Sequence, residues 1–205
     1  MKVIKIQKLE KPGSKLNFWQ SAVNLLDAAT GSSDHAYSVP GLSTVGPDGI
    51  PRSRRVVLRS VDTEQGILKI YTDRRSVKAR HLDSGSEFSF LFWDPESSIQ
   101  LACGGPTHWA PVGETEAVFT NLPKHGRKAY ATLPRPGSEL DAASSGLPAD
   151  WDDMDLSATD YALDNFGIAV TTLRWADVLH LDRNGNSRMA GTRPDRDWKW
   201  EWITP

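Results

Sequence analysis

Apolar and polar positions along the chain predict one helix followed by many short strands. Residues 17–29, NFWQSAVNLLDAA, carry apolar side chains at helical spacing, and Gly31 is a plausible end for this helix. Residues 36–62 contain short β-favouring runs separated by PG, GPDG and IP, which predicts a hairpin that turns around 47–49. This beginning is typical of an amphipathic helix that packs on a sheet.

The central part of the chain predicts further strands and one short helix. Residues 66–72, GILKIYT, alternate apolar and polar side chains, and residues 87–93, EFSFLFW, form a mostly apolar run bounded by turn signals. Two more strands are expected at 98–104 and 114–119. Residues 76–82, SVKARHL, combine a suitable N-cap serine with helix-forming residues, so we expect a short helix there.

The last third of the chain begins with a long irregular stretch. Residues 129–155 are rich in Pro, Gly, Ser and acidic residues, which predicts a surface loop with at most one helical turn; long loops of this kind often bind ligands or cover sites. Residues 157–165 are a candidate second helix. Three closing strands are expected at 166–174, 176–181 and 198–203. Many short strands with few helices predict one mainly antiparallel β domain over residues 1–205, either a barrel or a sandwich.

Composition and charge restrict the classes of function. The 205 residues suit a single domain with a sizeable core. The chain has 24 Lys and Arg against 26 Asp and Glu, a formal net charge of −2, so it has no overall positive field for nucleic acid or an anionic membrane. Residues 1–13 contain no apolar run long enough for a signal peptide or a membrane span, so we expect a cytoplasmic protein.

Cysteine and histidine usage argues against a redox or metal centre. Cys103 is the single cysteine, which excludes an internal disulfide and a CxxC motif, and we expect it to be a buried, inert thiol. The 5 histidines show no HxxxH or similar spacing, so no metal site is expected.

Cations are concentrated in one stretch, residues 54–82. If 54–59 is one strand, alternate side chains share a face. The two resulting sets are Arg55, Val57 and Arg59 on one face, and Arg54, Val56 and Leu58 on the other. Arg74, Arg75 and Lys78 follow the next strand, where the short helix is predicted to begin. Such a group of cations beside a helix start can bind a phosphate, although cations can also simply coat a solvated hairpin.

The order of motifs from residue 54 to 205 resembles the pyridoxamine 5'-phosphate oxidase family of FMN-binding split barrels, especially its more distant FMN-binding members. RRVVLR at 54–59 is similar to the family's Arg-x-Val-Leu-Leu-Lys strand, and YT at 71–72 followed by SVK at 76–78 to its Tyr-Thr and Ser-Arg-Lys element. Gln100 in IQLACG corresponds to the glutamine of its Arg-Gln-Val strand. The ending SRMAGTRPDRDWKWEWITP, with Arg188 and Trp198, resembles the family's closing Asp-Arg to Trp to Leu-x-Pro pattern.

The resemblance implies a mainly β (α+β) antiparallel split barrel with a few peripheral helices, FMN as cofactor and a homodimer with FMN at the subunit interface. Arg54, Ser76 and Lys78 would hold the ribityl phosphate. The residues implied in cofactor binding are Arg54, Arg55, Val56, Val57, Leu58, Arg59, Tyr71, Thr72, Ser76, Lys78, Gln100, Trp175 and Arg188. Trp175 and Arg188, with Ser144 and Ser145 as further candidates, would come from the second subunit. The residues implied in substrate binding are Arg59, Tyr130, Arg135 and Ser138.

Each of these residues also has a structural alternative, such as core packing for Trp175 or an ordinary strand position for Tyr71. Three departures from the family pattern bear on function. Val77 stands where the family has a phosphate-binding Arg, which Arg74 or Arg75 could replace, and Arg59 replaces a Lys. Asn184 and Asn186 fall where the true oxidases carry Arg-x-His, which argues against oxidation of pyridoxamine 5'-phosphate itself.

The sequence therefore predicts an FMN-dependent oxidoreductase that acts on an unidentified small molecule, with hydride transfer to flavin N5 and no partner nucleic acid or membrane. No acid–base pair is evident. Two other classes stay open. One is a flavin-binding or ligand-binding barrel without turnover, acting as a carrier or sensor. The other is a haem-handling relative, for which four histidines are available: His81, His108, His125 and His180.

Overall fold

The computed structural model describes residues 14–195 and 197–205, and the expectation for residues 1–13 lies outside them. Two antiparallel sheets are present: a seven-stranded sheet in the order β11-β10-β9-β6-β5-β1-β2 and a four-stranded sheet in the order β3-β4-β8-β7. The strands are β1 (Gly41–Val45), β2 (Pro51–Arg55), β3 (Leu58–Asp62), β4 (Ile67–Asp73), β5 (Phe88–Asp94), β6 (Ile99–Gly105), β7 (Thr107–Trp109), β8 (Phe166–Thr172), β9 (Trp175–His180), β10 (Ser187–Thr192) and β11 (Lys199–Ile203). The helices are α1 (Lys15–Ala29), α2 (Val77–Asp83), α3 (Val112–Thr120) and α4 (Lys124–Arg127), with 3-10 helices η1 (Ala36–Ser38), η2 (Trp151–Asp153) and η3 (Ser157–Asn165).

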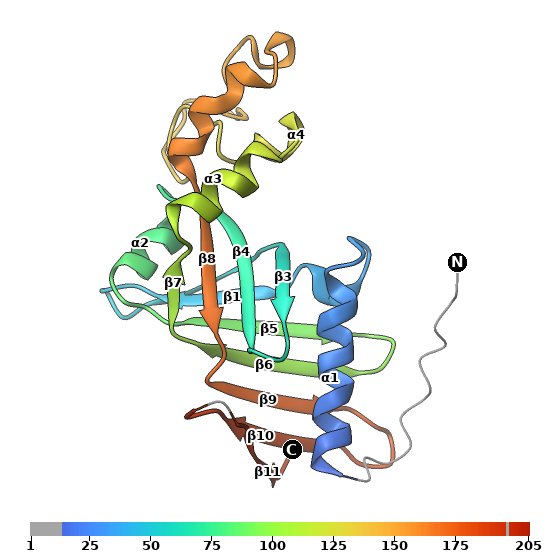
Figure 1. The fold of residues 1–205 in the computed structure, drawn as a ribbon. Coiled ribbons are helices and arrows are strands. Elements are labelled where there is room, and N and C mark those ends of the chain that lie inside the picture. The colour runs from blue at the N-terminus through green and yellow to red at the C-terminus, as the bar shows by residue number, and fades with distance from the viewer. Residues whose placement is uncertain (1–13, 196) are drawn as a thin grey trace, which may run out of the picture.

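The main core lies where the two sheets and α1 meet. Figure 1 shows the four-stranded sheet running across the seven-stranded one, with α1 crossing the same face beside β3. Helix α1 begins at Ser14, whose hydroxyl accepts the N–H of Asn17 at 3.2 Å, and it buries the apolar stripe expected from the sequence. Within the described residues, no helix is both long enough and apolar enough to cross a bilayer.

The stretch RRVVLR is not one strand, as the sequence suggested. Strand β2 ends at Arg55 in the seven-stranded sheet, and β3 begins at Leu58 in the four-stranded sheet. Burial still alternates through the crossing, because Val56 and Leu58 are 7% and 4% exposed whereas Val57 is 43% exposed. The two apolar side chains on the core side therefore fix the path of the chain between the sheets.

The expected strand at 114–119 was wrong, since these residues lie in α3. The helix starts after Pro111, and Thr115 and Phe119, which are four residues apart, are its buried side chains. Phe119 packs on Phe166 with ring centroids 5.5 Å apart. The run EAVF favours a strand when read alone, and contact with β8 overrides that preference.

Two strands had no counterpart in the sequence prediction. Strand β7 has only three residues, and β10 contains the sequence MAGT, which has little β propensity. The ring of Trp200 lies directly against Gly191 of β10, because a Cβ at this glycine would be 2.2 Å from the ring. A missing side chain thus allows the β10–β11 pairing to pack closely. The other expected strands are present within two residues of their predicted ends.

A second, smaller core forms beside β8 from α3, α4 and the segment that leads to η3, which projects beyond the sheets in Figure 1. The predicted long loop is confirmed, with η2 as its single helical turn, and the expected helix at 157–165 is the 3-10 helix η3. Arg127 lies inside this region and joins α4 to η3 through its ion pair with Asp160 at 2.7 Å.

Candidate functional site

Four residues predicted to contact the cofactor lie together near the start of α2, and we call them the Arg54–Lys78 cluster: Arg54, Thr72, Ser76 and Lys78. Ser76 is the N-cap residue of α2, but its hydroxyl makes no capping bond. It lies 3.4 Å from both the Thr72 hydroxyl and the Lys78 Nζ atom. The Arg54 guanidinium donates to Thr44 Oγ1 at 2.8 Å and to the carbonyl of Leu42 at 3.3 Å.

The cluster carries positive charge that no described side chain neutralises by direct pairing. Burial lowers the pKa of Lys78, and the neighbouring Arg54 lowers it further, while Asp73 opposes this shift. Burial and Arg52 likewise lower the pKa of Arg54. Among the described residues, neither cation has a carboxylate within 4.0 Å. Two partly desolvated cations with adjacent hydroxyl donors fit the phosphate end of FMN.

A second group of predicted residues lies on the outer side of the four-stranded sheet. The Arg59 guanidinium lies 5.2 Å from the centroid of the Tyr71 ring, and both Tyr71 and Tyr130 pack edge-on against Phe166. Burial raises the pKa of Tyr130 to about 12, and the nearby charge of Arg59 opposes that shift. Successive side chains of β4 point to opposite faces of the sheet, so Tyr71 and Thr72 lie on different sides. Thr72 belongs to the Arg54–Lys78 cluster, and Tyr71 belongs to the group around Arg59.

The other two predicted substrate residues lie on the long loop. Arg135 and Ser138 are exposed, and the N–H of Ser138 donates to the carbonyl of Arg135 at 3.1 Å. Arg75 ties this loop to the end of β4, because its guanidinium pairs with Asp73 at 2.7 Å and donates to the carbonyl of Thr132 at 2.9 Å.

Val77 stands where the family has a phosphate-binding arginine, and Arg74 and Arg75 were the candidate replacements. Each of them would have to give up a contact within the protein to reach the cluster. Arg75 holds the loop through the contacts just described. The Arg74 guanidinium lies 4.7 Å from the centroid of the Trp109 ring. Val77 itself is half-buried at the start of α2. A phosphate at this cluster would therefore depend on Arg54 and Lys78 for its countercharge.

The remaining predicted residues lie on the face of the seven-stranded sheet opposite the core. Gln100, Trp175 and Arg188 each neighbour a buried residue along their strands, so their own side chains point outward. Arg188 forms an ion pair with Asp177 at 2.8 Å. Ser144 and Ser145 are exposed on the long loop and accept hydrogen bonds from N–H groups two residues further on.

The exposed residues of the RRVVLR crossing add little to either group. Arg55 and Val57 face solvent, whereas Val56 and Leu58 are part of the core, so only their backbone could reach a ligand.

Sequence reasoning missed two residues that support the cluster. Thr44 and His81 are 1% and 4% exposed, and Thr44 Oγ1 lies 2.9 Å from His81 Nδ1. Leu42 and Thr44 alternate with Ser43 in this strand, so an inward Leu42 could have indicated an inward Thr44. No spacing signal connects it to His81, which lies 37 positions away.

The histidines and the cysteine are spread over the described part of the fold. The four histidines considered as haem ligands lie on separate elements: α2, β7, α4 and β9. In residues 14–195 and 197–205, no group of three His, Cys, Asp or Glu side chains is arranged to hold a metal ion. Cys103 is buried as expected, and burial raises the pKa of its thiol.

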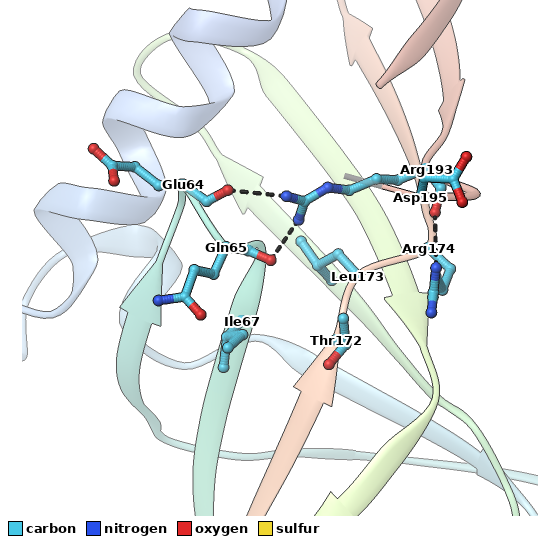
Figure 2. A pocket seen from close by; sticks show the side chains of 8 residues that line it. All are labelled: Glu64, Gln65, Ile67, Thr172, Leu173, Arg174, Arg193 and Asp195. Atoms are coloured by element: carbon cyan, nitrogen blue, oxygen red, sulfur yellow. Dashed lines mark hydrogen bonds between the residues drawn. The ribbon is translucent and has the colours of Figure 1, made fainter. Parts of the chain in front are cut away.

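A cavity of about 570 Å³ lies apart from the predicted site, between the β3–β4 turn and the segment after β10. Figure 2 shows Arg193 reaching across it to the backbone carbonyls of Glu64 and Gln65, the first at 2.9 Å. The residues that line it are Glu64, Gln65, Ile67, Thr172, Leu173, Arg174, Arg193 and Asp195. Its charged groups have both signs, so it does not select an anion.

Comparison with known proteins identifies the family. Residues 16–110 match the model described as "Pyridoxamine 5'-phosphate oxidase, FMN-binding domain". A pyridoxine/pyridoxamine 5'-phosphate oxidase of Streptomyces avermitilis is 30% identical over 171 residues, which cover 80% of this chain and 74% of that protein. The chain belongs to the pyridoxamine 5'-phosphate oxidase family. The family domain confirms FMN as the cofactor expected from the sequence.

Other family members match over a shorter segment. The oxidase of Thermosynechococcus vestitus is 34% identical over 86 residues, which cover 42% of this chain. This chain spans 40% of the length of that relative, and also 40% of the Hydrogenovibrio crunogenus oxidase, which is 33% identical over 88 residues.

Solved structures confirm the fold. An FMN-binding protein related to pyridoxamine 5'-phosphate oxidase, from Nostoc punctiforme, superposes with a TM-score of 0.73 at 21% identity and covers 91% of this chain and 97% of its own. PhzG from Burkholderia lata superposes with a TM-score of 0.66 at 16% identity, covering 99% and 98%. At these identities the likeness extends to the fold alone, which is the antiparallel split barrel with peripheral helices expected from the sequence.

Proposed function

We propose that this protein is an FMN-dependent oxidoreductase of its family that acts on a small molecule other than pyridoxamine 5'-phosphate. The observation that carries the proposal is the Arg54–Lys78 cluster, in which two partly buried cations lie together without a carboxylate partner among the described residues. Keeping two like charges close in a partly desolvated place is unfavourable without an anion. The phosphate of FMN is an anion of matching charge.

The residues of this chain would then divide the work between two groups. Arg54 and Lys78 bind the phosphate, and the hydroxyls of Thr72 and Ser76 lie within reach of the same anion. Bound FMN supplies the chemistry of accepting and passing on a hydride. Arg59, which lies over the ring of Tyr71 and near enough to Tyr130 to affect its pKa, presents a cation for a polar or anionic substrate group on the other side of β4.

The departures at the C-terminal motif argue for a different substrate. Asn184 and Asn186 lie in the turn between β9 and β10, where Asn186 Oδ1 accepts the N–H of Asp182 at 3.1 Å. Neutral amides at these two positions cannot supply the charge of the Arg-x-His pair that the true oxidases carry there. Oxidation of pyridoxamine 5'-phosphate is therefore not the activity that we propose.

We further propose that the protein is a cytoplasmic homodimer in which the outer face of the seven-stranded sheet meets a second copy. Leu91 and Trp93 are 48% and 41% exposed on this face, and Trp93 pairs with the predicted cofactor residue Gln100 on the neighbouring strand. Exposed apolar side chains on a sheet face favour association. Sedimentation equilibrium should give twice the chain mass, and Trp93→Lys should shift the mass towards the monomer. A monomeric wild type would contradict the dimer.

The cofactor proposal is tested by titrating protein freed of flavin with FMN and with riboflavin, which lacks the phosphate. Lys78→Ala should weaken FMN binding about 10- to 100-fold, the usual contribution of a hydrogen bond to a charged group, and leave riboflavin binding unchanged. Arg80→Ala is the matched control, because it removes an exposed cation from the same helix. Unchanged FMN affinity in Lys78→Ala, or equal losses for both flavins, would contradict the phosphate assignment.

Turnover is tested by adding NADH, NADPH or pyridoxamine 5'-phosphate to the FMN-loaded protein without oxygen. Bleaching of the flavin absorbance by one of the nicotinamides identifies a reductant and supports the oxidoreductase. Bleaching by pyridoxamine 5'-phosphate would contradict the proposed change of substrate. No bleaching by any of the three compounds would favour a protein that binds flavin without turnover.

A further inference from the structure

A buried hydrogen-bond chain joins three elements behind the phosphate cluster. The Arg54 guanidinium on β2 donates to Thr44 Oγ1 on β1 at 2.8 Å, and Thr44 Oγ1 lies 2.9 Å from Nδ1 of His81 on α2. Thr44 and His81 are almost completely buried, whereas Arg54 is half-buried. The chain therefore runs from the protein interior to one of the two proposed phosphate ligands.

The chemistry of the three groups fixes the direction of the first hydrogen bond and leaves two arrangements for the second. A guanidinium can only donate, so Thr44 Oγ1 accepts from Arg54. Thr44 keeps one hydroxyl hydrogen, which Nδ1 of His81 accepts when the imidazole carries its proton on Nε2; an Nδ1–H would instead donate to the second lone pair of Thr44 Oγ1. The first arrangement pairs the Thr44 hydroxyl hydrogen and places the imidazole proton on Nε2.

Packing and charge around the imidazole favour the same neutral state. A Cβ atom at Gly46 would lie 2.7 Å from His81 Nε2, so the ring is wedged between α2 and the β1–β2 turn. Burial lowers the pKa of His81, and Arg52, Arg54 and Arg80 lower it further, while Asp48 opposes them. The lowered pKa favours the neutral imidazole, the form in which Nδ1 can accept the Thr44 hydroxyl.

We infer that neutral His81 is a positioning residue for the cofactor site: it holds the Thr44 hydroxyl, and Thr44 holds the Arg54 guanidinium for the phosphate of FMN. The inference rests on the proposed function. An arginine has several rotatable bonds, and fixing one of its donors reduces the entropy that is lost when the anion binds. His81 itself touches no cofactor atom in this scheme.

The test uses variants that differ at Nδ1. His81→Leu keeps the bulk and removes the acceptor, whereas His81→Asn places an amide oxygen where Nδ1 lies. At pH 7.5, His81→Leu should weaken FMN binding about tenfold and riboflavin binding by less than twofold, as expected for one lost hydrogen bond. His81→Asn should restore FMN affinity to within about threefold of wild type. Equal loss of both flavins, or no rescue by Asn, would overturn the inference.

Two further measurements keep the inference testable if His81→Leu does not fold. Thr44→Val, which is isosteric, should reproduce the selective loss of FMN, and retention of full FMN affinity would overturn the positioning role. In flavin-free wild-type protein, long-range proton–nitrogen NMR correlations should show His81 protonated at Nε2 and not at Nδ1. A proton on Nδ1 would overturn the assigned direction.

Failure of this inference can be told apart from failure of the proposed function. If Arg54→Ala and Lys78→Ala leave FMN affinity unchanged, the phosphate site itself is wrong. If both weaken FMN selectively but His81→Leu does not, only the positioning role fails. Adding His81→Leu to Arg54→Ala should cause no further loss, because His81 acts through Arg54. An additive loss would show that His81 acts by another route.

Discussion

Arg127 should hold the smaller core together, and its removal gives a sharp test of that region. Its side chain is 3% exposed, and it donates to Asp160 at 2.7 Å, to the Thr159 hydroxyl at 3.0 Å and to the carbonyl of Leu156 at 3.1 Å. It also donates to the carbonyl of Phe119 at 3.3 Å, near the end of α3. One guanidinium thus satisfies acceptors from two segments that pack against α4.

Arg127→Met keeps much of the bulk and removes every one of these donors. Each lost hydrogen bond from this charged donor contributes about 1.5 to 3 kcal/mol, and the N–H donors that remain on the Leu156 and Phe119 carbonyls offset part of the sum, so we expect a loss of about 3 kcal/mol. Asp160 is 68% exposed, so water replaces its lost partner and Asp160→Asn should cost less than about 1 kcal/mol. The comparison separates the buried hydrogen bonds from the ion pair.

Urea unfolding followed by tryptophan fluorescence measures both losses, and hydrogen exchange locates them. In Arg127→Met, amides of 112–165 should exchange faster, whereas those of β5 and β6 in the main core should change little at low denaturant. A loss below about 1 kcal/mol, or equal losses in Arg127→Met and Asp160→Asn, would refute the reasoning.

Two other predictions concern a tight turn and an exposed acid. Gly66 has φ +67° and a Cβ there would strike the Arg193 guanidinium, whereas Gly49 has φ +73° and open space. Gly49→Ala should therefore lower the free energy of unfolding only by the left-handed backbone penalty of about 1 to 2 kcal/mol, and Gly66→Ala should lower it more. Urea unfolding measures both losses, and equal losses would contradict the contact between position 66 and Arg193. Arg52 lowers the pKa of Asp48 from 3.8 to about 2, so its stabilising effect is complete above pH 4 and disappears as the pH falls towards 2. Asp48→Asn should flatten this part of the pH–stability curve, most visibly at low salt, and an unchanged curve would contradict the pairing.

The parts of the fold that sequence reasoning predicted are those with strong local periodicity. Helix α1 and strands β4, β5 and β6 have one face in a single core, so their patterns are regular. Strand β10 was missed because its pairing depends on Gly191 fitting under the ring of Trp200, a contact between distant residues. Helix α3 was misassigned because the short run EAVF is compatible with either a strand or a helix. Packing against β8 determines that it is helical.

Sequence reasoning predicted the site residues that belong to a recognisable motif. It did not predict the residues outside any motif that contact them. The resemblance picked out Arg54, Ser76 and Lys78, and the structure brings them together. Thr44 and His81 carry no motif, since a buried threonine and a lone histidine are ordinary core residues in sequence terms. The role proposed for them depends on two contacts that no motif marks: the register of β1 and β2, which brings Thr44 near Arg54, and the packing of α2, which brings His81 to Thr44.

The crossing at Val56 and Val57 explains how one short motif can serve two groups of residues. Because β2 ends at Arg55 and β3 begins at Leu58, Arg54 belongs to the edge of one sheet and Arg59 to the edge of the other. Val56 and Leu58 are buried on the core side, so the main core fixes the relative position of the two arginines. In the proposed enzyme, Arg54 faces the cofactor phosphate and Arg59 the substrate. The core contacts of Val56 and Leu58 would therefore set the distance between bound FMN and the substrate. Hydride transfer requires that distance to be fixed, and no single side chain can fix it.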